Sequence, residues 1–240
     1  MKKHQFSNRD LTILLIPLIL EQLLTSLMGT IDTIMVSNVG SAAISAVSLV
    51  DSINILILMA MTALATGGSI VCSQYIGNED YKSANNAAKQ IIFCVTFISL
   101  TLMIISLVFK RQLLSLIFGQ VEQSVMEGAI IYFFYTAISF PFIGLYNAGA
   151  SIFRSQRNTK LPLIISVISN IINVIGNYIL IFIIKIGVAG AAIATLISRV
   201  FLAVVVLYYL RNENQIKVKQ PLKVLYFSGN KDIQFAVDRY

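Results

Sequence analysis

The chain has 240 residues, of which 57% are hydrophobic and 12% charged, and its formal net charge is +7. A soluble globular domain carries about 25% charged residues, so this composition excludes an ordinary water-soluble protein. The basic residues are scattered between apolar runs and form no basic stripe interleaved with aromatic residues. We therefore expect membrane lipid, and no nucleic acid, among the partners of this chain.

Apolar stretches long enough to cross a bilayer occur six times along the chain. A transmembrane helix needs roughly 20 mainly apolar residues. The stretches that reach this length cover residues 11–36, 43–73, 90–109, 128–152, 161–184 and 187–210. The sequence thus predicts an all-α integral membrane protein, with an amino-terminal segment at 1–10, a six-helix bundle at 11–210 and a polar tail at 211–240.

The lysine and arginine residues of the connecting segments predict the orientation. If the amino terminus is cytoplasmic, the outward connections contain only Lys110, Arg111 and Lys185. The inward segments contain Lys2, Lys3, Arg9, Lys82, Lys89, Arg154, Arg157, Lys160 and the basic tail from Arg211. By the positive-inside rule, both termini are expected in the cytoplasm.

The first span contains a polar stripe. Its members recur at i, i+4, i+8 and i+11, which is one face of a helix, and are Glu21, Thr25, Gly29 and Asp32. Insertion of an Asp at the centre of a membrane helix costs about 2.5–3.5 kcal/mol, so such a residue indicates a functional site. We expect the stripe to form one wall of a polar cavity. The alternative for Asp32 is a carboxylate near the interface, hydrated or bonded to a neighbouring helix.

The second span contains a further acid, Asp51, beside Ser48 and Ser52. Residues 74–89 are expected to form a partly helical inner loop, and residues 110–128 an outer connection with a short amphipathic helix. Proline inside an apolar run removes a backbone hydrogen bond, which predicts helix kinks at Pro17 and Pro141.

The fifth span has a matching polar face, formed by Ser166, Asn170, Asn173 and Asn177 at i, i+4, i+7 and i+11. Unsatisfied polar groups facing lipid cost several kcal/mol each, so this face is expected to form the opposite wall of the cavity. Ordinary interhelical hydrogen bonding is the alternative.

A buried carboxylate opposite amide oxygens suits a cation, because such oxygens can replace the water around sodium and the carboxylate can take up a proton. Arg199, near the middle of the sixth span, is expected to pair with an acid such as Asp51 or Glu21. Cys72 and Cys94 lie far apart in or beside apolar stretches, and no nucleotide-binding or catalytic motif occurs. We predict neither enzymatic activity nor a cofactor other than the coupling ion.

The sequence resembles the amino-terminal lobe of multidrug and toxic compound extrusion (MATE) transporters over residues 10 to 210. The resemblance rests on LLIPLILEQLLTSLMGTIDTIMVSNVG with Pro17 and Asp32, on AAISAVSL, on FRSQRNTKLP, and on NVIGNYILIF followed by GVAGAAIAT. It implies secondary active export of cationic and amphipathic compounds across the plasma membrane, driven by sodium or protons. It also implies that Asp32 is the cation-responsive acid, helped by Asn173 and Thr195, with Asn147 facing the same cavity.

Two departures from the family pattern stand out. Many members have an acid where this chain has Asn177, which puts the ion preference in doubt. A complete member has two six-helix lobes, whereas this chain contains six spans. The sequence leaves open a truncated or split reading frame, which we favour, a parallel homodimer, and a separate partner chain. The alternative functions are a flippase of lipid-linked saccharides and a membrane fragment that does not transport.

Overall fold

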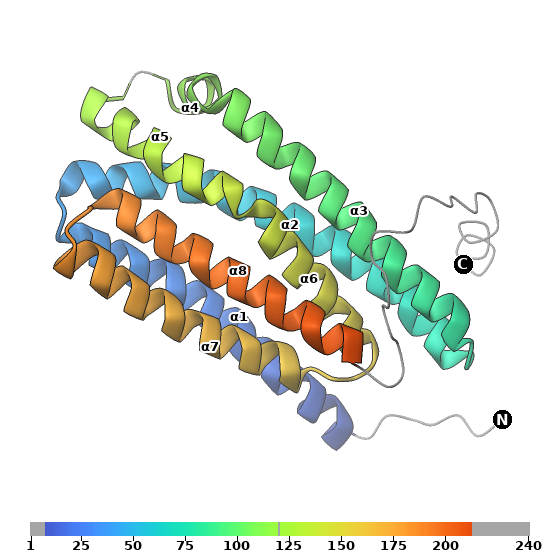
Figure 1. The fold of residues 1–240 in the computed structure, drawn as a ribbon. Helices are drawn as coiled ribbons and strands as arrows, with labels where there is room; N and C mark the ends of the chain where they lie inside the picture. The colour runs from blue at the N-terminus through green and yellow to red at the C-terminus, as the bar shows by residue number, and fades with distance from the viewer. Residues whose placement is uncertain (1–7, 120, 213–240) are drawn as a thin grey trace.

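The computed structural model describes residues 8–119 and 121–212, which form a helical bundle (Figure 1). The long helices are α1 (Asn8–Ser37), α2 (Ser41–Gly77), α3 (Tyr81–Val108), α7 (Lys160–Asn177) and α8 (Val188–Asn212). The shorter ones are α4 (Lys110–Phe118), α5 (Gln123–Ile138), α6 (Phe140–Ser155) and the π-helical turn η1 (Tyr178–Ile183). The predictions for residues 1–7 and for the tail beyond 212 lie outside the described residues.

The six predicted spans are confirmed. Five helical segments are long and apolar enough to cross a membrane, namely α1, α2, α3, α7 with η1, and α8. The sixth span is the pair α5 and α6, which are bent by 44° at a short break. Ser139 lies at this break, two residues before Pro141, so the kink predicted at Pro141 is present. By contrast, α1 runs through Pro17 as one helix.

The connections differ in part from the prediction. The inner loop predicted over residues 74–89 is mostly helical, because α2 continues to Gly77 and α3 begins at Tyr81. The carboxylate of Asp80 caps α3 by accepting a hydrogen bond from Ser83 N at 3.0 Å. Hydrogen bonds from Ser83 also hold the pKa of Asp80 below its usual value. The short helix expected in the outer connection is present as α4.

Two clusters of buried apolar side chains fill the bundle. The inner cluster joins α2, α3, α6 and α8, with Met61, Phe153 and Leu210 among its members. The outer cluster joins α2, α4, α5 and α8, with Val50, Leu114 and Phe133 among its members. Helix α1 contributes little to either cluster, and its exposed apolar side chains include Leu15, Ile19, Leu23, Leu27 and Ile34. Helix α1 packs mainly against α7 and, less closely, against α2, and its buried residues include the acids Glu21 and Asp32.

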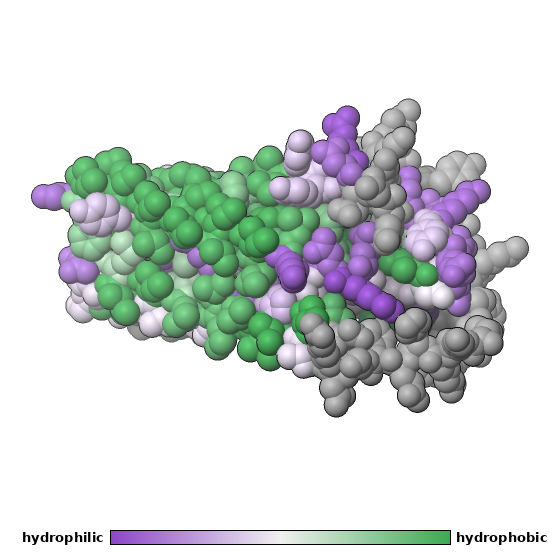
Figure 2. All heavy atoms as spheres, turned by 90° about the horizontal axis from the view of Figure 1, so that it is seen from below, coloured by the Kyte–Doolittle hydropathy of each residue, from purple (hydrophilic) through white to green (hydrophobic). Residues whose placement is uncertain are grey.

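Figure 2 shows that apolar side chains cover much of this face of the bundle, while hydrophilic residues gather toward one end. That end contains the α2–α3 turn and the α6–α7 connection, and we call it the inner end. The connections at the inner end contain Lys82, Arg157 and Lys160, whereas those at the opposite, outer end contain Lys110, Arg111 and Lys185. The basic residues predicted for the inward and outward segments thus lie at opposite ends of the bundle. Which end faces the cytoplasm stays a prediction.

Close packing of α6 against α8 requires a glycine at position 149. A Cβ at Gly149 would lie 2.7 Å from Cγ2 and 3.0 Å from Cγ1 of Val206, which is fully buried. We expect Gly149→Ala to destabilise the chain by about 1–3 kcal/mol through overpacking. Gly67→Ala is the matched control, because a Cβ there meets nothing within 4 Å. Thermal unfolding in detergent would test this, and equal melting of wild type and Gly149→Ala would contradict it.

Candidate ion-binding site

Asp32 lies in the outer half of α1 and faces α7. Its side chain is largely buried, with 8% of the residue exposed, and Asn177, fully buried on α7, donates a hydrogen bond from Nδ2 to Asp32 Oδ1. This contact joins residues 145 positions apart. The expectation that the polar faces of the first and fifth spans oppose each other is met here, by direct contact between Asp32 and Asn177.

The hydrogen bonding continues from α7 into α8. The same Nδ2 of Asn177 donates to Asn173 Oδ1 at 3.0 Å, and Asn173 Nδ2 donates to Thr195 Oγ1 at 3.2 Å. Thr195 Oγ1 in turn donates to the carbonyl oxygen of Ala191 at 3.0 Å. A chain of hydrogen bonds thus links three helices: the Asn177 amide donates to the Asp32 carboxylate on one side, and from Asn177 the donors run through Asn173 and Thr195 into α8 on the other. We call Asp32, Asn173, Asn177 and Thr195 the carboxylate–amide site.

One atom of this site is left without a partner. Both hydrogens of the Asn177 amide are used, and its Oδ1 is buried with no hydrogen-bond partner among the described residues. A buried carbonyl oxygen without a donor is costly unless something else satisfies it. Carboxylate, amide and hydroxyl oxygens are ligands that hard cations such as sodium accept. Asp32 with the Asn177 oxygen therefore offers the chemistry of a small monovalent cation site.

A second polar cluster lies next to the first, between α2, α5 and α8. Asp51 Oδ1 accepts hydrogen bonds from Asn54 Nδ2 at 3.2 Å and from the Tyr132 hydroxyl at 3.3 Å. Arg199 donates from Nη1 to Ser139 Oγ at 2.7 Å. The charges of Asp51 and Arg199 act on each other and on Asp32. Among the described residues Arg199 forms no ion pair with an acid, so the predicted pairing with Asp51 is not seen; its hydrogen bond goes to Ser139.

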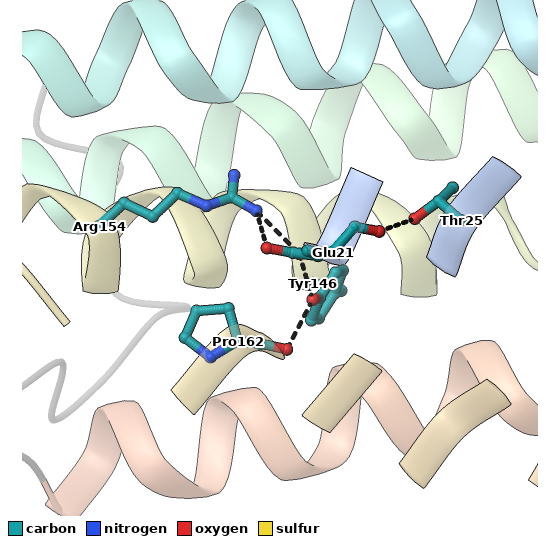
Figure 3. A network of polar contacts seen from close by, with 5 residues as sticks. All are labelled: Glu21, Thr25, Tyr146, Arg154 and Pro162. Atoms are coloured by element: carbon teal, nitrogen blue, oxygen red, sulfur yellow. Dashed lines mark hydrogen bonds and ion pairs between the residues drawn. The ribbon is translucent and has the colours of Figure 1, made fainter. Parts of the chain in front are cut away.

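Glu21, near the middle of α1, forms a separate network on the inner side of Asp32 (Figure 3). Arg154 Nη2 on α6 lies 2.8 Å from both carboxylate oxygens of Glu21. The Tyr146 hydroxyl lies 2.7 Å from Glu21 Oε1 and 3.1 Å from the Pro162 carbonyl oxygen, so it shares one hydrogen between two acceptors. The prediction that Glu21 pairs with Arg199 is wrong, since its partner is Arg154. Glu21 therefore anchors α1 to α6 and α7.

The remaining candidates are less enclosed. Thr25 is exposed and donates from Oγ1 to the Glu21 carbonyl oxygen at 2.9 Å, so the stripe on α1 is not one continuous buried wall. Of the polar face of α7, Ser166, Asn173 and Asn177 are buried and Asn170 is half-buried. Asn147 on α6 is half-buried too, and its place in a cavity stays a prediction.

Sequence reasoning missed the partners that come from distant helices. Tyr132, Tyr146 and Ser139 lie in apolar runs, where a tyrosine or serine is unremarkable. Arg154 was assigned to a basic inner loop, although it lies at the end of α6, within reach of α1. The one available signal was Glu21 itself, since an acid at that depth requires a cation partner.

These features define a class of protein: a polytopic membrane protein built as one helical lobe with ionisable residues buried between its spans. Comparison with known proteins makes the class specific. The family model described as MatE matches residues 17–179, and the chain belongs to this family, that of the MATE transporters.

The relatives show how much of a MATE protein the chain represents. It is 29% identical over 207 residues to the uncharacterized transporter YisQ of Bacillus subtilis, covering 84% of this chain and 45% of that protein. It is 24% identical over 232 residues to the probable multidrug resistance protein NorM of Thermotoga maritima, covering 94% and 49%. The chain thus spans about half the length of these curated relatives.

Solved structures give the same picture of the fold. A crystal structure of MATE in complex with MaD3S matches with a TM-score of 0.84 at 24% identity, covering 94% of this chain and 50% of that one. An outward-facing MATE transporter of the MOP superfamily matches with a TM-score of 0.82 at 24% identity and similar coverage. The described bundle corresponds to one lobe of this fold.

Loss of Arg154 and loss of Glu21 are expected to destabilise the chain to different extents. The Glu21 side chain is 8% exposed and that of Arg154 is 28% exposed, so only Arg154 can reach water when its partner is lost. We expect Arg154→Gln to destabilise the chain by about 2–3 kcal/mol and Glu21→Gln by about 1 kcal/mol. The double variant should be more stable than Arg154→Gln alone. Denaturation of the four proteins in detergent measures this, and a larger loss in Glu21→Gln would refute it.

Proposed function

We propose that this chain is one lobe of a cation-coupled exporter that expels cationic or amphipathic compounds across the plasma membrane, with both termini in the cytoplasm. The single observation that carries the proposal is the contact of Asp32 with Asn177, backed by Asn173 and Thr195. It puts an ionisable group and cation-binding oxygens at the junction of α1, α7 and α8. Several relatives carry names such as probable multidrug resistance protein, which supports the export of drugs.

The coupling ion is a sodium ion or a proton. Either would neutralise Asp32 and weaken the hydrogen bond from Asn177, because that amide donates to the charged carboxylate. Helix α1 packs its apolar side chains on the lobe sparingly, so loss of this contact releases its outer half more easily than its ion-paired inner half. A ligand shifts the equilibrium between the attached and the released position of α1 only by its differential affinity for these two states, and Asp32 supplies that difference.

A second lobe completes the transporter in this proposal. The chain covers about half of its relatives, and exporters of this type move substrate at the interface between two repeats. The second lobe is a further part of a longer polypeptide, another copy of this chain or a separate partner chain. The substrate then occupies the space between the lobes, while the ion stays within this one.

We expect Asp32→Asn to abolish the dependence of export on an ion gradient. The measurement is efflux of a cationic dye from vesicles that carry the full chain, with an imposed sodium or proton gradient. Asp80→Asn is the matched control, because Asp80 is an exposed acid outside the spans and Asn remains a good helix cap. Gradient-driven efflux that persists unchanged in Asp32→Asn would contradict the assigned role.

A further inference from the structure

The second polar cluster repeats the chemistry of the carboxylate–amide site. In both clusters an asparagine donates from Nδ2 to an aspartate, as Asn177 does to Asp32 and Asn54 does to Asp51. In both, the oxygen of that asparagine is buried and has no partner among the described residues. Asn54 is 3% exposed, so its orphan oxygen lies in the interior beside the Asp51 carboxylate. The pairing of a carboxylate with an unsatisfied amide oxygen thus occurs twice in one lobe.

The partners of Asp51 are neutral. Its Oδ1 accepts from the Asn54 amide and from the hydroxyl of Tyr132, whose residue is 2% exposed. Arg199 acts on Asp51 electrostatically, but its guanidinium is hydrogen-bonded to Ser139 at 2.7 Å. Donors of this kind hold a carboxylate in place while leaving its charge to be balanced by something else. A bound cation would find carboxylate, amide and phenol oxygens together.

The charges of the two clusters limit how many cations fit. When ionised, Asp32 and Asp51 are negative and Arg199 is positive, and the three groups lie close enough across α1, α2 and α8 to interact electrostatically. Tyr132, from α5, is the further titratable group in this set. With both aspartates ionised, the set has one excess negative charge, which one monovalent cation neutralises. Isolated charge in the low-dielectric interior is expensive, so a second cation would be opposed by Arg199.

We propose that Asp51, Asn54 and Tyr132 form a second binding site for a sodium ion, and that Arg199 restricts the two sites of the lobe to one ion at a time. The inference rests on the proposed use of Asp32 as a cation-binding acid, and it adds a site on α2 and α5. When the ion is at Asp32, Arg199 balances Asp51. When the ion is at Asp51, Arg199 balances Asp32.

The sharpest test removes Asp32 and the competing positive charge of Arg199 together. Asp32→Asn/Arg199→Gln keeps the excess charge of wild type but places it on Asp51 alone. Equilibrium binding of radioactive sodium to the purified full chain in nanodiscs, at alkaline pH, should give one ion for wild type, none for Asp32→Asn and one for the double variant. Asp32→Asn/Arg199→Lys keeps the competing charge and should bind none.

The bound ion must also depend on the second site. Adding Asp51→Asn to the double variant should abolish binding, and adding Asn54→Leu should weaken it about tenfold or more, because an oxygen ligand is lost. Adding Ser52→Ala, on an exposed neighbouring position of α2, should leave it unchanged. Circular dichroism and size-exclusion chromatography verify that each variant is folded before binding is measured.

The proposal is overturned if the folded double variant binds no sodium, takes up a proton in its place, or keeps its sodium after Asp51→Asn. These results are distinct from failure of the proposed function. Wild type that binds one ion only with Asp32 present, combined with a double variant that binds none, preserves the role of Asp32 and removes the second site. If instead the loss of Asp32 does not reduce binding and the double variant binds one ion, Asp32 has no role in sodium binding and the second site is preserved.

Discussion

The bilayer interior cannot solvate a charge, and this constraint determines where the ionisable side chains of this lobe lie and what they touch. Each of the three acids in the spans accepts hydrogen bonds from within the bundle: Glu21 from Arg154 and Tyr146, Asp32 from Asn177, and Asp51 from Asn54 and Tyr132. Only Glu21 has a cationic side chain in direct contact. The other two acids are held by neutral groups, which is how a site is left open to a mobile cation.

The same constraint determines how firmly α1 is attached to the rest of the lobe. A helix that packed through a broad apolar stripe would be fixed by many small contacts, but α1 leaves most of its large apolar side chains on the surface. Its buried acids are Glu21, near the middle of the helix, and Asp32, eleven residues further toward the outer end. Glu21 is held by an ion pair within the protein, whereas, within the described residues, Asp32 has no cationic side chain in direct contact. An ion that binds at Asp32 therefore acts on the half of α1 that no ion pair holds.

The six spans and the facing of Asp32 and Asn177 follow from the sequence, because spans are set by apolar length and a helix face by spacing alone. Partners from other helices do not follow, as with Glu21 and Arg154, since the choice among buried cations depends on how helices pack. The apolar runs around Tyr132 and Ser139 gave no sign that these residues bind Asp51 and Arg199. Nor did the sequence reveal the π-helical turn η1, which begins directly after Asn177 and continues the span.

The proposed mechanism depends on a cation that binds at the Asp32 carboxylate. Infrared difference spectroscopy on the full chain in nanodiscs tests it directly, by following carboxyl and carboxylate bands as the pH is lowered or sodium is added. We expect a carboxylate signal in wild type that is missing in Asp32→Asn and retained in Asp80→Asn. Difference spectra that are identical in wild type and Asp32→Asn, under both proton and sodium addition, would contradict it.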